Sequence, residues 1–279
     1  MASRLYIVAT PVGNLEDTTL RALRILKEAA AVACEDTRVT RKLFSRYEIK
    51  NRLISCHEHN EEKQTETIIG ILKDGGDVAL VTDAGTPLVS DPGYRVAARV
   101  AEEGFDVVPI PGASALLCAL CASAIPFSGF VFLGFFPRQK GKAAKVLSEF
   151  VLSPHPVVIY ESPKRTAKTL ALLRETLGDR AAAVCREMTK LHEEVSRASL
   201  SSLAEDFKKR ENVKGEIVIV VAGAEEGASD EPDEKELEKR LLELKKQGAT
   251  FTDALKTMSS ESGMGKNALY DFALKVWGN

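Results

Sequence analysis

Three absences limit what this chain can be. No apolar run approaches the roughly 20 residues that a membrane-spanning helix needs, and residues 1–13 lack the long apolar stretch and cleavage site of a signal peptide. The 279 residues include only five cysteines, an odd number, and most lie in apolar surroundings. Such cysteine use is typical of a reducing compartment. We therefore expect a cytoplasmic protein without a membrane segment.

The motifs of several common enzyme classes are also missing. The sequence has no G-x-G-x-x-G dinucleotide fingerprint, no G-x-x-x-x-G-K-[ST] phosphate loop and no G-x-S-x-G nucleophile elbow. Cys118 and Cys121 match C-x-x-C, but they fall in an apolar helical stretch, where core cysteines are common. Residues 56–59 (CHEH) alternate between opposite sides of a predicted strand end, and no second cluster has zinc spacing. We therefore expect no metal site.

Residues 78–94 (VALVTDAGTPLVSDPGY) contain the most informative pattern. The apolar run Val78–Val81 is typical of a buried parallel strand. The small residues of 83–87 end it, and 90–93 (SDPG) predict a helix start with Asp91 as the cap-type residue before proline. A loop at the carboxyl end of a parallel strand is where open α/β sheets bind ligands. Loops of similar character follow β-rich runs at 10–14, 111–115 and 160–165.

The order of the elements predicts an α/β protein with several parts. Residues 1–112 alternate strands with helices, which predicts a parallel sheet covered on both faces. Residues 113–224 form a second α/β domain, whose sheet is expected to be mixed because 193–198 alternate like a strand with one wet face. Residues 225–233 are an acidic linker. Residues 234–279 predict three short helices with a glycine turn at 263–265, a small helix-turn-helix-like domain whose nucleic-acid role stays open.

The loops suggest a chemistry. With the motifs of hydrolysis, redox and phosphoryl transfer missing, four small-residue loops suit a nucleoside-like ligand held by backbone groups. Methyl transfer from a sulfonium donor fits, because the donor is already activated and the protein mainly positions two reactants. The net charge of −2 argues against a general polyanion binder, so any nucleic-acid contact must come from local basic patches.

Ordered segments along nearly the whole chain resemble the tetrapyrrole methylase superfamily, and most of all its ribosomal RNA branch. The segments are LYIVATPVGNL (5–15), EDTR (35–38), 82–93, PGASA (111–115), GFFP (134–137), YESPKR (160–165), REMTK (186–190) and KGE (214–216). Relatives that methylate tetrapyrrole carbons carry Gly-Asp-Pro where this chain has Gly85-Thr86-Pro87. That departure leaves open whether Thr86 or Asp83 makes the polar contact to the donor.

The resemblance implies a fold and a function. It implies two α/β domains with S-adenosylmethionine in the cleft between them (a class III methyltransferase), a small C-terminal helical domain and a homodimer. It also implies 2'-O-methylation of a cytidine in the decoding region of small-subunit (16S) ribosomal RNA. The alternatives are a tetrapyrrole C-methyltransferase, and a non-catalytic ribosome-assembly binder. Thr86, the basic loops and the C-terminal helices argue against the first, and the intact donor loops argue against the second.

The same resemblance assigns donor contacts loop by loop, with simple loop packing as the alternative for each residue. Val89 and Met188 are expected to enclose the adenine. The expected donor contacts are Pro11, Val12, Asp83, Ala84, Gly85, Thr86, Val89, Ser114, Ala115, Tyr160, Glu161 and Met188.

A ribose hydroxyl is a poor nucleophile until its proton is lost or shared, so a general base is sought. The candidates are Glu161, Glu187 and Lys190, the last only if burial lowers its pKa. Their alternative role is an ion-pair cluster between the two domains. Phe136 is the best exposed candidate for base stacking. The predicted RNA-contacting residues, or alternatively solvated helix faces, are Arg38, Arg41, Arg138, Lys140, Lys142, Lys164 and Arg165.

Overall fold

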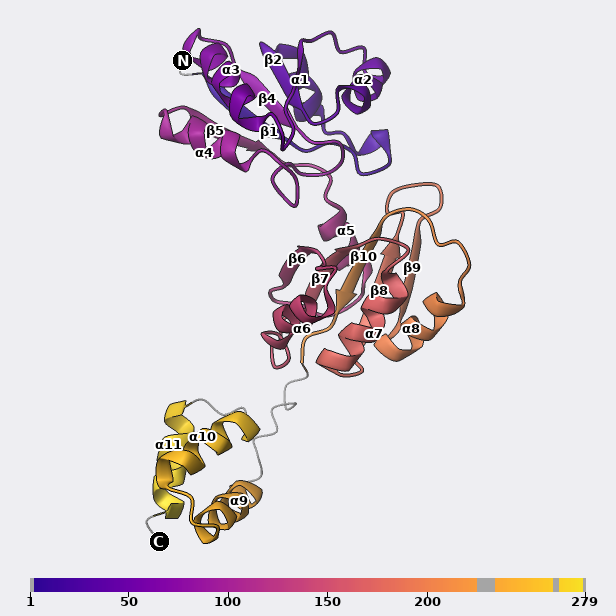
Figure 1. The fold of residues 1–279 in the computed structure, drawn as a ribbon. Helices are drawn as coiled ribbons and strands as arrows, with labels where there is room; N and C mark the ends of the chain where they lie inside the picture. Colours follow the sequence, from indigo (N-terminus) through magenta and orange to yellow (C-terminus); the bar gives the residue numbers. More distant parts are fainter. Residues whose placement is uncertain (1–2, 225–233, 263–265, 278–279) are drawn as a thin grey trace. The chain divides into compact units, whose positions relative to one another are not determined.

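The structure is a computed structural model that describes residues 3–224, 234–262 and 266–277 (Figure 1). The chain divides into two compact units, residues 1–223 and 224–279, each considered by itself. The predicted acidic linker and the predicted glycine turn at 263–265 lie outside the described residues. Among the described residues, no helix combines the length and apolarity needed to cross a membrane.

The first sheet is entirely parallel, as predicted. Its strand order is β3-β2-β4-β1-β5. The strands β1 and β4 are neighbours at its centre, although they lie more than 70 positions apart in the chain. The five strands are β1 (Arg4–Val8), β2 (Ala31–Cys34), β3 (Leu53–Ser55), β4 (Val78–Val81) and β5 (Asp106–Ile110).

Helices cover both faces of this sheet. Side chains along a strand alternate between faces, so Tyr6 and Val8 pack in one apolar cluster while Leu5 and Ile7 pack in the other. The first cluster includes α1 (Leu20–Glu28) and α2 (Thr37–Arg46), and the second includes α3 (Glu61–Lys73) and α4 (Tyr94–Glu102). Between β1 and β2 the chain forms a short 3-10 turn (Leu15–Asp17) and then α1, which the Thr19 side chain caps.

The chain therefore leaves the two central strands in opposite directions. After β1 it enters α1 on one face of the sheet, and after β4 it enters α4 on the other face. A crevice opens at such a reversal point, at the carboxyl ends of the strands. The small-residue loops predicted from the sequence therefore lie at this crevice, which is where such folds bind ligands.

The second sheet is mixed, which confirms the prediction. Its order is β6-β7-β10-β8-β9, with β6 and β7 parallel and the remaining neighbours antiparallel. The edge strand β9 carries the alternating polar pattern noted in the sequence. The strands are β6 (Val131–Phe135), β7 (Val157–Glu161), β8 (Ala181–Arg186), β9 (Glu194–Ser199) and β10 (Ile217–Val221).

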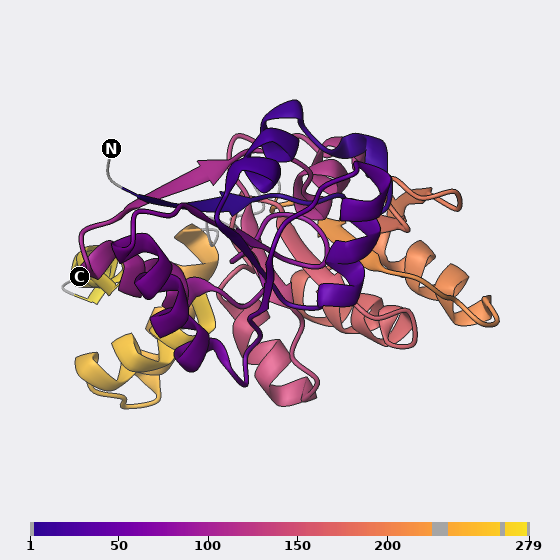
Figure 2. The same ribbon diagram turned by 90° about the horizontal axis from the view of Figure 1, so that it is seen from above.

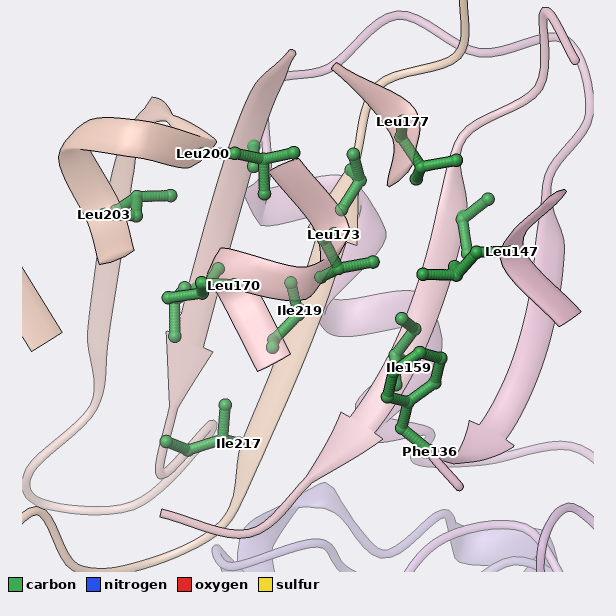
Figure 3. Packing of buried hydrophobic residues seen from close by; sticks show 14 of the residues in the cluster. Phe136, Leu147, Ile159, Leu170, Leu173, Leu177, Leu200, Leu203, Ile217 and Ile219 are labelled. Atoms are coloured by element: carbon green, nitrogen blue, oxygen red, sulfur yellow. The ribbon is translucent and has the colours of Figure 1, made fainter. Parts of the chain in front are cut away.

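One face of this sheet carries α6 (Lys140–Ser148), α7 (Thr166–Leu177) and α8 (Leu200–Lys209), and the other carries α5 (Ala115–Ala122). Figure 2 shows α7 and α8 side by side. In Figure 3, leucines of α6, α7 and α8 meet Ile159 and Ile219 of the sheet in one continuous core.

The core also corrects one prediction. Phe136, expected to be exposed, is only 3% exposed and packs in this core, whereas its neighbour Phe135 is 70% exposed.

The second unit is a small helical bundle. Its helices are α9 (Glu234–Lys246), α10 (Phe251–Ser262) and α11 (Lys266–Trp277). Leu241, Met258 and Ala273, one from each helix, belong to its apolar core. Thr250 caps α10, because its hydroxyl oxygen accepts from the Asp253 backbone N–H at 3.2 Å.

The side chains of Asn60 and of Asp91, the predicted cap residue, do not cap the helices that follow them. Asn60 precedes α3, but its Oδ1 accepts from the His57 backbone N–H (2.8 Å) and makes no bond to the helix. The N-cap residue of α4 is Gly93, which has no side chain to cap the helix, and not Asp91. Instead, the buried Glu61 accepts from the backbone N–H groups of Gly93 (3.0 Å) and Arg95 (3.2 Å). A carboxylate at this end also complements the helix dipole.

We predict that Glu61→Ala destabilises the fold by about 1–3 kcal/mol, because two helix N–H groups lose a charged acceptor in a buried place. Urea denaturation of both variants measures this, with the exposed neighbour substitution Glu62→Ala as the matched control, expected within about 0.5 kcal/mol of wild type. Equal midpoints for the two variants would contradict the capping role of Glu61.

Candidate functional site

The loops after β1 and β4 are tied together at the reversal point. The backbone N–H of Thr10 donates to the carbonyl of Gly85 (2.8 Å), and the N–H of Gly85 donates to the carbonyl of Thr10 (3.0 Å). The Thr10 hydroxyl also donates to the Thr82 carbonyl at 3.0 Å. Gly85 has a φ of +88°, which glycine adopts at little cost.

Two further loops join this pair. The Thr86 hydroxyl donates to the Ala113 carbonyl (3.1 Å) in the loop between β5 and α5. One carboxylate oxygen of Asp83 accepts from the Asp36 backbone N–H (3.0 Å) in the loop after β2. The sequence left open whether Thr86 or Asp83 contacts the donor. The side chains of both residues are hydrogen-bonded within the protein.

These loops and the second sheet enclose a cavity of about 400 Å³. It brings together most of the predicted donor contacts, namely Val12, Asp83, Ala84, Gly85, Thr86, Val89, Ser114, Ala115, Tyr160 and Glu161. Pro11 and Met188 do not line it. Met188 is only 8% exposed and packs in the apolar cluster under α5, against which Val89 also packs in part.

The cavity has a further set of walls that the sequence argument did not assign to ligand binding. Most of them lie in segments that carried the family resemblance, which was the available signal. The ring of Phe135 lies edge-on to Tyr160, with centroids 5.5 Å apart. The additional lining residues are Ser90, Asp91, Phe135, Ser162, Pro163, Gly215, Glu216, Ile217 and Val218.

The charge of this lining has one sign. Four carboxylate residues face the cavity, and no Lys, Arg or His belongs to the lining that the structure describes. The four are Asp83, Asp91, Glu161 and Glu216. Opposite charges attract more strongly near a low-dielectric wall than in bulk water. Glu161 and Glu216 pair with Arg165 and Lys190, so Asp83 and Asp91 supply the negative charge that has no ion-pair partner in the described residues. The cavity therefore favours a ligand with positive charge and disfavours a phosphate.

Three acidic side chains on this side of the sheet hold their protons more tightly than usual. Burial raises the pKa of Asp83 and that of Glu35. Burial, reinforced by the charges of Glu35 and Asp83, raises the pKa of Asp91 to about 6, although the Thr82 side chain acts in the opposite direction. The largest cause is the same for all three, since burial removes water from each carboxylate.

Glu161, a predicted catalytic residue, is 4% exposed and fully engaged. Its Oε2 accepts from the Thr169 hydroxyl (2.6 Å) and pairs with Arg165 (3.2 Å), and its Oε1 accepts from the Ser162 backbone N–H (2.6 Å). It lines the cavity, but these bonds mainly fix the loop between β7 and α7.

Glu187 and Lys190 do form an ion-pair cluster, but its third member is Glu216, so its ion pairs lie within the second predicted α/β domain and not between the two domains. The Lys190 ammonium donates to Glu187 and to Glu216, both at 2.8 Å. Burial acts to lower the pKa of Lys190, but the hydrogen bonds to Glu187 and Glu216 outweigh it and raise the pKa. The condition under which Lys190 could be a base is therefore not met. Neither Glu187 nor Lys190 lines the cavity.

The predicted RNA-contacting residues differ in availability. Arg38 pairs with Asp36 (2.6 Å), Lys140 pairs with Glu175 (2.9 Å), and Arg165 donates to two carbonyls in the loop after β6. The others lie on the surface without a role in the core, namely Arg41, Arg138, Lys142 and Lys164.

The possible metal ligands and cysteines have ordinary surroundings. No group of three or more His, Cys, Asp or Glu residues in the described part of the chain has the arrangement of a metal site. All five cysteines are free thiols. The expectation that the C-x-x-C pair lies in the core is wrong for Cys121, which is exposed, while Cys118 is half-buried.

With this geometry in place, comparison with known proteins is informative. A sequence model of the tetrapyrrole (corrin/porphyrin) methylases matches residues 4–204. The chain belongs to the tetrapyrrole methylase family. A solved cobalt precorrin-4 methyltransferase shares its fold, with a TM-score of 0.59 at 17% identity over 78% of this chain and 94% of that one.

Individual relatives are more similar in sequence. The chain is 44% identical over 273 residues to the ribosomal RNA small subunit methyltransferase I of Mesorhizobium japonicum, covering 98% of this chain and 92% of that protein. The protein of the same name from Thermotoga maritima is 43% identical over 222 residues, covering 80% of this chain and 99% of the relative. That relative has no counterpart for about a fifth of this chain.

We predict that Glu187→Gln lowers stability by about 1 kcal/mol at pH 7, because a charged hydrogen bond to Lys190 is lost. That bond holds the pKa of Glu187 below its ordinary 4.5. The stabilisation is therefore present above pH 4.5 and is lost as the pH falls through the lower, folded-state pKa.

Urea denaturation from pH 3 to pH 7 measures this difference, with the exposed Glu211→Gln as control. A gap between Glu187→Gln and wild type that stays constant down to pH 3 would contradict the ion pair as its source.

Proposed function

We propose that the protein is an S-adenosylmethionine-dependent methyltransferase that 2'-O-methylates a cytidine in the decoding region of small-subunit ribosomal RNA. The main observation in favour of S-adenosylmethionine as the donor is the carboxylate-lined cavity at the reversal point of the first sheet. The names of relatives about 40% identical to this chain support ribosomal RNA as the acceptor. The cytidine 2'-hydroxyl follows from the resemblance of the ordered loop segments.

The residues present fit this donor. A volume of about 400 Å³ is in the range of small-molecule sites. Val12, Val89 and Ala115 offer apolar surface to an adenosine, while the carboxylates suit a ligand with two positive groups and one negative group. When bound, S-adenosylmethionine supplies a methyl group activated by a positively charged sulfur.

The chain's own contribution is mainly positioning. The Thr10–Gly85 and Thr86–Ala113 bonds hold three loops in fixed register around the cavity. The edge-on pair of Phe135 and Tyr160 forms an apolar wall that excludes water from one side. Holding two reactants in the productive geometry can lower a barrier by several kcal/mol, on the order of 7–11 in well-oriented cases.

RNA contact is proposed for the exposed basic residues Arg41, Arg138, Lys142 and Lys164. Their charges can neutralise phosphates outside the cavity, whose own lining disfavours phosphate. Arg38, Lys140 and Arg165 would first have to leave their partners in the protein. We also propose that the molecule works in the cytoplasm as a homodimer, and that residues 1–112, 113–224 and 234–279 act as its domains.

The central experiment transfers labelled methyl from S-adenosylmethionine to small ribosomal subunits that lack the modification, followed by nucleoside analysis. We expect label in 2'-O-methylcytidine. Label in another nucleoside would refute the assigned acceptor, and the absence of transfer despite donor binding would refute the RNA function. Transfer to a uroporphyrinogen or precorrin instead would establish a tetrapyrrole methyltransferase.

The RNA contacts have a test of their own. The double variant Arg138→Ala/Lys142→Ala should bind small subunits more weakly. The slope of log K against log salt should fall in magnitude by about 1–2, since each lost phosphate contact contributes roughly 0.7–0.9. The matched control is Lys208→Ala/Lys209→Ala, which removes two exposed lysines at the end of α8. Identical slopes for both variants would exclude this surface as an RNA contact.

A further inference from the structure

A second cavity adjoins the first. It has a volume of about 380 Å³, and Ser90 and Asp91 belong to the linings of both cavities. Its other walls are Glu35, Glu58, Glu61 and residues 92–95. A two-substrate transfer needs two binding spaces that meet at the reacting atoms. Ser90 and Asp91 form the only wall shared by the two cavities among the lining residues described.

The backbone holds this wall in an unusual conformation. Leu88 and Ser90 have φ angles of +75° and +67°, in the left-handed region that non-glycine residues rarely adopt. Such strain persists only where the surroundings fix it, and it is common at functional sites. Gly134 of β6 makes room for the segment, since a Cβ there would lie 2.9 Å from the Ser90 hydroxyl.

Asp91 has no structural task that explains this placement. Residues of its type before a proline commonly cap helices, but Glu61 accepts the N–H bonds at the start of α4. Nor does Asp91 take part in any of the ion pairs found in the described residues. The carboxylate is thus available on the shared wall, whereas those of Glu161 and Glu187 are engaged by neighbouring donors.

A buried hydroxyl lies beside it. Thr82 is only 4% exposed, and its Oγ1 has no hydrogen-bond partner at bonding distance among the described residues. The Thr82 side chain is near the carboxylates of both Glu35 and Asp91 and acts to lower the pKa of each. A buried polar group usually has a partner. The Thr82 hydroxyl is therefore placed to donate to either carboxylate on this wall.

The titratable groups around Asp91 set its proton affinity. Glu35 and Asp83 face it from the loops after β2 and β4, and Tyr160 faces it from the second sheet. Burial together with the two carboxylates raises the pKa of Asp91 to about 6. A base with a pKa near 6 is ionised at neutral pH and binds a proton more readily than an ordinary aspartate.

We propose that the second cavity admits the acceptor nucleoside and that Asp91, on the wall shared by the two cavities, accepts the proton of its ribose hydroxyl. The proposal rests on the proposed function. In the step, the hydroxyl oxygen bonds to the methyl carbon, and its proton passes to the Asp91 carboxylate. The bond between that carbon and sulfur breaks, with its electron pair going to sulfur. Charge and atoms balance, because the carboxylate and the sulfonium are both neutralised.

The charge of the second cavity agrees with a nucleoside rather than a phosphate. Its carboxylates are Glu35, Glu58, Glu61 and Asp91, against the single basic residue Arg95. Carboxylates accept hydrogen bonds from ribose hydroxyls and from the exocyclic amine of cytosine, and they repel phosphates. The backbone of the RNA would therefore remain outside, near the exposed basic residues.

The test compares Asp91→Asn with wild type in methyl transfer to unmethylated small subunits from pH 5 to pH 9. Loss of a general base should slow turnover by about 100-fold or more at pH 7.5. Wild-type turnover should fall as the pH drops through about 6, and the variant should lose this limb. Calorimetric affinity for S-adenosylmethionine should fall far less than turnover, by about tenfold at most, which corresponds to about 1.4 kcal/mol, because the other lining carboxylates remain. The exposed Asp74→Asn is the matched control, which lines neither cavity.

Two readouts do not depend on activity. In the wild-type protein, carbon-13 NMR of labelled aspartates should show one carboxyl that titrates near pH 6, and Asp91→Asn should lack it. Because the raised pKa means that ionised Asp91 is held at a cost above pH 6, the Asn variant should melt at a higher temperature than wild type at pH 7.5. That advantage should vanish below about pH 4, where Asp91 of wild type is protonated in both the folded and the unfolded state.

The outcomes distinguish failure of Asp91 as the base from failure of the proposed function. If wild type methylates small subunits but Asp91→Asn turns over within threefold of it, Asp91 is not the base. The same conclusion follows if no aspartate titrates above pH 5. If wild type methylates no ribosomal RNA, the proposed function itself fails, and the role of Asp91 with it. Asp91→Glu, which keeps the carboxylate but displaces it, should retain more turnover than Asp91→Asn and guards against a folding defect.

Discussion

Two backbone hydrogen bonds between Thr10 and Gly85 fix the geometry on which the rest of the site depends. They join loops that leave adjacent parallel strands toward opposite faces of the sheet and would otherwise move apart. The bonds from Thr86 to Ala113 and from Asp36 to Asp83 extend the same arrangement to the neighbouring loops. The cavity is thus a consequence of strand order, and its lining is set by which residues immediately follow each strand.

This dependence explains what the sequence could predict. The apolar run Val78–Val81 located the strand β4, and the alternation of strands and helices predicted the parallel sheet. Because strand ends in such a sheet share one edge, most of the predicted donor contacts do line the cavity. The pattern of small residues was informative because close backbone approach, as at Gly85, requires them.

Other features depended on contacts that no local pattern contains. The register of β6 against β7 shifts between Phe132 and Phe135, so alternation could not tell that Phe135 faces outward and Phe136 the core. Asp91 resembled a helix cap in sequence, and only the fold brings Glu61 to that helix instead. The raised pKa of Lys190 depends on Glu216, 26 positions away along the chain. Pro11 and Met188 have the right neighbours in sequence but lie outside the cavity lining.

The single sign of charge in the first cavity bears on how a catalytic cycle would end. Under the proposed function the donor would enter with a positively charged sulfur, and after methyl transfer it would be an uncharged thioether beside the same carboxylates. The Coulombic attraction that favours capture is therefore cancelled by the reaction it supports. Under the proposed function, a site of this kind would attract the spent donor less strongly than the fresh one, which favours exchange of one for the other.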